Sequence, residues 1–266
     1  MNILEQIIAH KKMEVAERKE TISVKMLERS SCFERNCYSL KHSLLCSDTG
    51  IIAEFKRKSP SKGWIYPEAR PEVITPAYQK GGASGLSILT DTYYFGSNST
   101  DITSVRHLIQ IPILRKDFII GPYQIFEAKA MGADVILLIA AILKPKQTAD
   151  LTTLAKSLGL EVLLELHNAK ELEYINPAVN MVGINNRDLK TFKVNLDASL
   201  QLHTMIPDSF VKISESGISN AESVITLRQA GFRGFLMGEN FMKTKDPGKT
   251  CAKFVKKLQN LENDRS

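Results

Sequence analysis

Short apolar runs alternate with stretches of helical periodicity along most of this chain. From residue 51 onward there are eight such runs, rich in β-branched residues, and each has the length of one buried strand. The runs are Ile51–Phe55, Gly85–Thr90, Pro112–Arg115, Asp134–Ile139, Glu161–Leu166, Met181–Ile184, Val211–Ser214 and Gly234–Met237. Helical stretches follow them at 70–81, 100–109, 122–131, 146–158, 168–175, 196–204, 219–231 and 247–261. The pattern therefore predicts eight β-α units in series.

Eight such units favour an α/β fold of the closed (β/α)₈ type, a TIM barrel. Strands that are apolar almost throughout predict a parallel sheet buried on both faces, and eight strands are the number that closes this barrel. The rival fold is an open, doubly wound sheet, which usually carries a G-x-G-x-x-G turn after an early strand. The chain has no such turn, so we expect the barrel.

The first 48 residues show a different pattern. Residues 2–19 read as an amphipathic helix and residues 38–46 as a second short helix, and no strand pattern precedes Gly50. We expect 1–48 to be an N-terminal helical extension packed on a barrel of residues 49–266, the two forming one domain. The extension is expected to cover the barrel mouth and shield it from water.

Composition narrows the class of protein. Hydrophobic residues make up 43% of the chain, but no apolar run reaches the roughly 18 residues of a membrane span. The N-terminus lacks a secretory signal, so we expect a cytoplasmic protein without membrane association. Four cysteines (Cys32, Cys37, Cys46 and Cys251) lack the paired spacing of a zinc site, so we expect incidental thiols and no metal.

The charge balance is basic, with a formal net charge of +6 and an isoelectric point near 9.0. Nucleic acid is one partner that such a charge favours, yet the lysines are scattered among acids and form no stripe interleaved with aromatics. A solvated basic surface and an anionic small-molecule substrate together account for the surplus. We therefore expect no nucleic-acid partner.

Ionisable and amide side chains stand at or just beyond the ends of the predicted strands. The active site of such a barrel lies at the carboxyl ends of its strands, so these side chains should point into a shared mouth. Lys and Glu are rarely buried unless paired, and a cluster of both signs shifts pKa values as acid–base catalysis requires. These residues include Glu54, Lys56, Asp91, Lys116, Asp117, Glu165, His167, Asn185, Arg187, Glu215 and Glu239.

Glycines after the last two strands indicate a phosphate site. Gly217 follows Ser216, and Gly238 precedes Glu239, each just before a helical stretch. A glycine before a helix lets backbone N–H groups approach an anion, and such barrels often hold phosphate in these two loops. The alternative is that both glycines only make tight turns.

Six sequence blocks, in order and each at a strand end, make the chain similar to the indole-3-glycerol phosphate synthase family over about residues 2 to 261. The blocks span residues 52–63, 87–91, 113–118, 164–167, 183–189 and 214–218. The resemblance implies that a carboxyphenylamino-deoxyribulose 5-phosphate is converted to indole-3-glycerol phosphate with loss of carbon dioxide and water, in tryptophan biosynthesis. It implies no metal and no organic cofactor. The family also occurs fused to an isomerase barrel, but this chain ends at Ser266, so we expect the single-function form. We also expect a monomer or weak homo-oligomer.

Carried over residue by residue, the resemblance also implies roles. Lys116 resembles the general acid of ring closure and Glu165 the acid–base group of dehydration, although a salt bridge of Lys116 with Asp117 is an alternative. Glu54 and Glu215 either react or tune the lysines. The resemblance further implies that Lys56 binds the substrate and is a second proton donor. It implies that Arg187, Asn185 and Ser59 hold the carboxylate and position the ring, with Phe95 and Phe118 as apolar walls. The phosphate loops that it implies contain Ser216, Gly217, Gly238 and the backbone of Glu239.

The chain differs from the family's sequence pattern at two places, and two other functions are alternatives. Residues 95–98 read Phe-Gly-Ser-Asn where the family commonly has Phe-Gly-Gly-Ser, and Asn240 replaces a usual serine. One rival is another phosphosugar barrel such as phosphoribosylanthranilate isomerase, which lacks the extension and the block at 113–118. The other rival is a barrel that only binds, although every charged residue of the family's site is present here.

Overall fold

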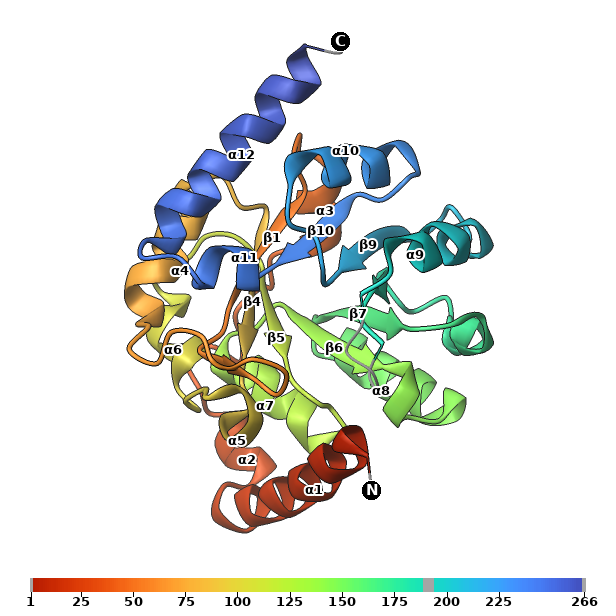
Figure 1. Ribbon diagram of the computed structural model, residues 1–266. Helices are drawn as coiled ribbons and strands as arrows, with labels where there is room; N and C mark the ends of the chain where they lie inside the picture. The colour runs from red at the N-terminus through yellow and green to blue at the C-terminus, as the bar shows by residue number, and fades with distance from the viewer. Residues whose placement is uncertain (1, 189–193, 265–266) are drawn as a thin grey trace.

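Eight parallel strands close into one barrel in the computed structural model, which describes residues 2–188 and 194–264. Around the barrel the order is β1-β10-β9-β8-β7-β6-β5-β4, and β1 pairs with β4 to close it (Figure 1). The predicted (β/α)₈ barrel is confirmed. The strands are β1 (Ile51–Phe55), β4 (Gly85–Leu89), β5 (Ile113–Lys116), β6 (Val135–Ile139), β7 (Glu161–Leu166), β8 (Met181–Asn185), β9 (Val211–Glu215) and β10 (Gly234–Met237).

Alternate residues of each strand face the barrel interior and the surrounding helices. The interior cluster includes Ile52, Leu114, Leu163 and Ile213, while their neighbours along the strands pack under the helices. Both sheet faces are thus buried, which is why the strands read as continuous apolar runs. The interior positions continue two residues further into Glu54, Lys116, Glu165 and Glu215 at the carboxyl ends. The alternation that builds the core therefore also aims the charged residues into the mouth.

Helices surround the barrel at the predicted places (Figure 1). They are α4 (Pro71–Lys80), α6 (Asp101–Arg106), α7 (Tyr123–Met131), α8 (Pro145–Ser157), α9 (Leu196–Leu202), α10 (Ala221–Gln229) and α12 (Pro247–Asn263). The stretch predicted at 168–175 is instead a 3₁₀ segment, η2 (Ala169–Tyr174). None of the helices within 2–188 and 194–264 is long and apolar enough to cross a membrane.

Several short elements were not predicted, because they are shorter than the stretch of sequence over which periodicity can be recognised. They are the 3₁₀ segments η1 (Ala140–Ile142) and η3 (His203–Met205), the helices α2 (Val24–Leu27), α5 (Thr92–Phe95) and α11 (Glu239–Met242), and a hairpin of β2 (Lys58–Ser59) and β3 (Gly63–Trp64). Three of these, α5, α11 and the hairpin, contribute residues to the barrel mouth.

The helices of the N-terminal extension lie at two different places on the barrel. Helix α3 (Leu40–Leu45) inserts Leu40 and Leu44 into the interior cluster, close to glycines that begin β4 and β10. It therefore closes the end opposite the mouth. Helix α1 (Ile3–Thr21) starts with a capping box between Asn2 and Glu5 and packs on α7 (Figure 1). The expectation that the extension covers the mouth is wrong for α3 and stays a prediction for α1, whose residues Ile3, Leu4 and Ile7 line the cavity there.

Candidate active site

A cavity of about 550 Å³ opens at the carboxyl ends of the strands. Its wall combines charged, aromatic and glycine residues from six strand ends with apolar residues of α1. Of the residues that the sequence analysis placed at the mouth, Asp91, His167 and Glu215 are not in the wall. Glu215 contacts the amino group of Lys116, and Asp91 pairs with Lys11 instead of facing the cavity. The selected wall residues are Glu54, Lys56, Ser59, Phe95, Lys116, Phe118, Glu165, Asn185, Arg187, Ser216, Gly217, Gly238 and Glu239.

The amino group of Lys116 is surrounded by three carboxylates from three other strands. Lys116 Nζ lies 3.0 Å from Glu215 Oε2 and 3.8 Å from both Glu54 Oε2 and Glu165 Oε2. The alternative pairing with Asp117 is wrong, because successive residues at a strand end point to opposite sides. Asp117 instead faces Lys11 and Arg115.

The close contact of these four charged groups shifts the pKa values of Lys116 and Glu215. Burial opposes a charge on Lys116, but Glu215, Glu54 and Glu165 outweigh it and raise the pKa of the ammonium well above its usual range. Burial raises the pKa of Glu215 to about 7, against the pull of Lys116 and helped by the repulsion of Glu165. Lys116 is therefore a charged acid at neutral pH, and the carboxylate cluster exchanges a proton near neutrality.

Glu165 is held by two neighbours, Asn185 at the end of β8 and His167 just after β7. Asn185 Nδ2 donates to Glu165 Oε1 at 3.2 Å, and His167 Nε2 lies 3.2 Å from the same oxygen. Burial favours neutral His167, but contacts with Glu165 and Glu171 outweigh it and raise the pKa of the imidazole to about 10. Glu165 has a lowered pKa because, although burial raises it, His167 and Lys116 outweigh that effect. Sequence reasoning gave His167 no role, although its spacing of two from Glu165 was a usable signal.

Glu54 belongs to a second ion pair at the end of β1. Lys56 Nζ lies 2.7 Å from Glu54 Oε1, as their spacing along one strand predicts, and Ser87 donates to the other oxygen at 3.4 Å. Burial opposes ionisation of Glu54, but Lys56 and Lys116 outweigh it and lower the pKa of the carboxyl group.

Two glycines make room for the carboxylates. A Cβ at Gly183 would overlap Glu215 Oε1, and a Cβ at Gly238 would stand 2.6 Å from Glu54 Oε1. Sequence reasoning assigned Gly238 to phosphate and overlooked Gly183, because the clash involves a neighbouring strand. Both glycines thus serve the carboxylate cluster sterically, whatever ligand the cavity holds.

The loops after β9 and β10 have the features of an anion site. Ser216 and Gly217 adopt left-handed backbone conformations (φ 69° and 75°), and α11 begins directly after Gly238. The Glu239 carboxylate lies 3.8 Å from Arg187 Nη2 and 4.0 Å from Lys62 Nζ, and its negative charge would repel an anion. Only the backbone of Glu239 is thus suited to an anion.

An apolar end completes the cavity. The rings of Phe95 and Phe118 tilt toward each other with centroids 6.1 Å apart. Ile3, Leu4 and Ile7 of α1 line the same cavity. Sequence reasoning missed these three, although Ile3 and Ile7 share one face of a helix.

A metal site is not evident among the described residues. Within 2–188 and 194–264, no group of three or more His, Cys, Asp or Glu side chains is arranged to hold a metal ion.

Solved structures resemble this barrel at low sequence identity. Tryptophan synthase subunit alpha from Legionella pneumophila superposes with a TM-score of 0.62 at 14% identity, covering 84% of this chain and 98% of that one. The tryptophan synthase A-subunit from Pyrococcus furiosus gives a TM-score of 0.58 at 16% identity, with 80% and 99% covered. These likenesses show the fold.

Sequence relatives are much closer. An indole-3-glycerol phosphate synthase of Bacteroides thetaiotaomicron is 53% identical, covering 97% of this chain and 99% of the relative. One from Laribacter hongkongensis is 42% identical, with 94% and 98% covered. A sequence model of the indole-3-glycerol phosphate synthase family matches residues 4–254. The chain belongs to the indole-3-glycerol phosphate synthase family.

Proposed function

We propose that this chain converts 1-(2-carboxyphenylamino)-1-deoxyribulose 5-phosphate into indole-3-glycerol phosphate, carbon dioxide and water. The observation that carries the proposal is the position of Lys116. Its ammonium stands among three carboxylates, in a cavity with an aromatic wall, an arginine and glycine-rich strand ends. A substrate with a ring, a carboxylate and a phosphate matches these three features.

Ring closure needs an acid at the carbonyl oxygen of the substrate. As the aromatic carbon attacks the carbonyl carbon, charge develops on that oxygen, and Lys116 stabilises it and gives it a proton. The Glu54 and Glu215 carboxylates hold the ammonium in place and favour its charged form. The carboxyl group then leaves as carbon dioxide, and its bonding electrons restore the conjugation of the ring.

Dehydration follows at the hydroxyl group that ring closure creates. Glu165 is ionised beside charged His167, so it can accept the proton that the intermediate loses. Lys56, paired with Glu54, is proposed as a second proton donor for the departing hydroxyl. Because a carboxylate leaves as neutral carbon dioxide, the overall reaction takes up a proton in each turnover.

Binding uses the two ends of the cavity. The Arg187 guanidinium suits a planar carboxylate through paired hydrogen bonds, and Asn185 and Ser59 stand in the same wall. The phosphate is assigned to the backbone around Ser216, Gly217 and Gly238 and to Lys56. A cytoplasmic location and a monomeric or weakly associating state stay predictions of the sequence.

A fluorescence assay for the indole product tests the proposal. Purified protein is mixed with the proposed substrate in EDTA, and product is followed with time. We expect turnover in EDTA, because the acids and bases of the mechanism are side chains. A folded protein that forms no indole product would overturn the proposal, and phosphoribosylanthranilate turnover or salt-dependent DNA retention would identify the rival barrels.

A further inference from the structure

The buried face of α1 carries one lysine among apolar residues. Ile7, Lys11 and Val15 are the buried residues of this helix and follow one another at intervals of four, so they form a single stripe. Lys11 is completely buried, with no exposed side-chain surface. Burying an ammonium group is unfavourable unless charges and hydrogen-bond acceptors compensate it. The barrel therefore has to supply those partners.

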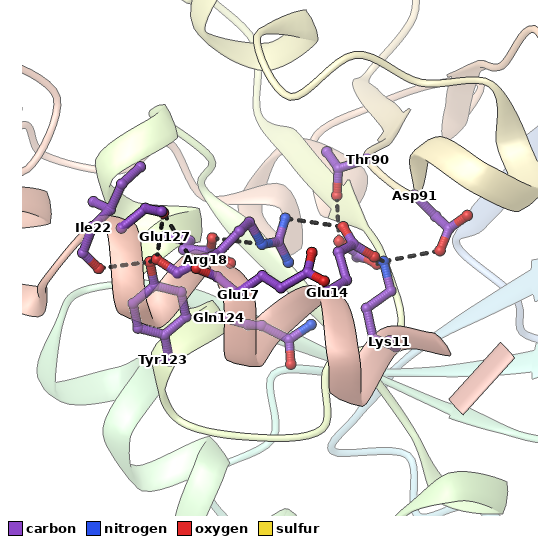
Figure 2. Close-up of polar contacts among 12 residues, drawn as sticks. Lys11, Glu14, Glu17, Arg18, Ile22, Thr90, Asp91, Tyr123, Gln124 and Glu127 are labelled. Carbon is purple, nitrogen blue, oxygen red and sulfur yellow. Dashed lines mark hydrogen bonds and ion pairs between the residues drawn. The ribbon is translucent and has the colours of Figure 1, made fainter. Parts of the chain in front are cut away.

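Three carboxylates meet the ammonium group of Lys11 (Figure 2). Lys11 Nζ lies 2.7 Å from Glu14 Oε2, 2.8 Å from Asp91 Oδ2 and 2.9 Å from Asp117 Oδ1. Asp91 and Asp117 are themselves almost fully buried. Burial disfavours a charge on Lys11, but Asp117, Asp91 and Glu14 outweigh it and raise the pKa of the ammonium above its usual range.

The two aspartates belong to the segments that carry the aromatic walls. Asp91 follows β4 and caps α5, since its Oδ1 accepts from Tyr94 N at 2.7 Å, and α5 ends at Phe95. Asp117 stands between Lys116 and Phe118, and its Oδ1 also accepts from Phe118 N at 2.8 Å. A single ammonium group thus joins α1, the segment with Phe95 and the segment with Phe118.

The remainder of the network fixes the same parts from behind. Asp117 Oδ2 accepts from Thr90 Oγ1 at 2.6 Å and from Arg115 Nη2 at 3.0 Å. Asp117 therefore keeps partners if Lys11 is removed, while Asp91 loses its charged partner. The loss should loosen α1 and α5 more than the strand that bears Lys116.

A second anchor holds the far end of α1. Arg18 Nε lies 3.2 Å from Glu127 Oε1, and the Tyr123 hydroxyl donates to the carbonyl groups of Arg18 and Ile22 at 3.1 and 2.9 Å (Figure 2). This anchor is about 10 Å along the helix from Lys11, given the rise per residue. Lys11 is thus the polar anchor nearer to Ile3 and Ile7, which line the cavity.

We propose that Lys11 is a positioning residue for the aromatic ring of the substrate, because it fixes Ile3 and Ile7 of α1 against the Phe95 and Phe118 walls. The ring is identified through the proposed function. Lys11 itself does not touch the reacting atoms, and it stands apart from the loops assigned to phosphate. Its effect should therefore divide between the two ends of the ligand.

Calorimetric binding of two small probes tests this division without requiring turnover. Lys11→Met keeps an unbranched apolar side chain as long as the aliphatic part of lysine and removes the ammonium group. Lys12→Met is the matched control, because Lys12 is the next residue on the same helix and is exposed. We expect Lys11→Met to raise the Kd for anthranilate roughly tenfold, or about 1.4 kcal/mol, with the Kd for inorganic phosphate unchanged. Unchanged binding of both probes, or equal loss of both, would overturn the proposal.

A milder variant keeps the test valid if Lys11→Met does not fold. Asp91→Asn weakens the link between Lys11 and α5 and leaves the Asp117 contact in place. It should shift anthranilate binding in the same direction and should speed hydrogen exchange of the Ile3–Lys11 amides but not of β5. Unchanged anthranilate affinity in a folded Asp91→Asn variant contradicts the role of Lys11, whether or not exchange of α1 becomes faster. Wild-type turnover in the indole assay is a separate measurement, so the two proposals can fail independently.

Discussion

Lys116 at the end of β5 and Glu215 at the end of β9 face each other across the barrel mouth, with Nζ and Oε2 3.0 Å apart. The residues are 99 positions apart in sequence, and barrel closure brings them together. Glu54 and Glu165 also approach the same ammonium group, so one cation balances part of a threefold negative charge. This surplus of carboxylates keeps Lys116 charged and leaves one proton exchangeable near neutral pH.

Glu215→Gln should change the pH dependence of catalysis. The pKa of Glu215 is about 7, so in the wild type its ionised form, which holds Lys116, is lost as the pH falls below 7. We expect kcat/KM of the wild type to fall on this acidic side. The variant should be roughly tenfold slower, because one charge-assisted hydrogen bond is lost, and flat from pH 6 to 8. An unchanged acidic limb in the variant would assign that proton to another group.

Glu215→Gln should also change how thermal stability depends on pH. The folded-state pKa of Glu215 lies above the usual value of 4.5, so its stabilising contribution is present at low pH and is lost as the pH rises through 7. The melting temperature of Glu215→Gln minus that of the wild type should therefore increase as the pH rises from 5 to 8. A difference that is independent of pH contradicts the shifted pKa.

Gly183→Ala should damage activity through Glu215. The added Cβ would overlap the Glu215 carboxylate and would stand 3.2 Å from Leu163 Cδ1, so Glu215 has to move away from Lys116. We expect kcat to fall roughly tenfold or more. Gly121→Ala is the control, because nothing lies within 4 Å of its added Cβ. Equal kinetics of both variants would show that the position of Glu215 is unimportant.

His167→Gln should reveal a charged histidine. Because the folded-state pKa of His167 is raised from 6.5 to about 10 by Glu165 and Glu171 against the effect of burial, its stabilising contribution is complete below pH 6.5 and is lost as the pH rises through 10. The melting temperature of the wild type should exceed that of the variant by more at pH 6 than at pH 10. A gap that grows with pH would mean that His167 is neutral in the folded protein.

Arg187→Ala should weaken binding more than it slows chemistry. A charged hydrogen bond is worth about 1.5–3 kcal/mol, so KM should rise roughly ten- to a hundredfold. Thermal melts recorded beside the kinetics separate this effect from unfolding. A variant with normal KM and low kcat would move Arg187 from binding into the chemical steps.

The barrel could be predicted from the sequence because its strands are buried on both faces and its helices are long enough to show their period. The charged positions of the mouth could be predicted as well, since each continues an interior stripe of its strand. The need for a glycine at position 183 could not be predicted, because a larger residue there would overlap Glu215 on the neighbouring strand. The register between two strands cannot be derived from the sequence pattern of either strand. Lys11 resembled a surface lysine of a charged helix, and only packing against Asp91 and Asp117 reveals its burial.

The central claim is that the Lys116 ammonium performs ring closure, and turnover by Lys116→Ala tests it most directly. Indole product is measured for the wild type, this variant and Lys12→Ala, each with a thermal melt. We predict that Lys116→Ala shows the thermal transition of a folded protein and that its kcat is at least roughly a hundredfold lower than that of the wild type. Lys12→Ala should retain wild-type activity. A folded Lys116→Ala variant with wild-type turnover would contradict the account.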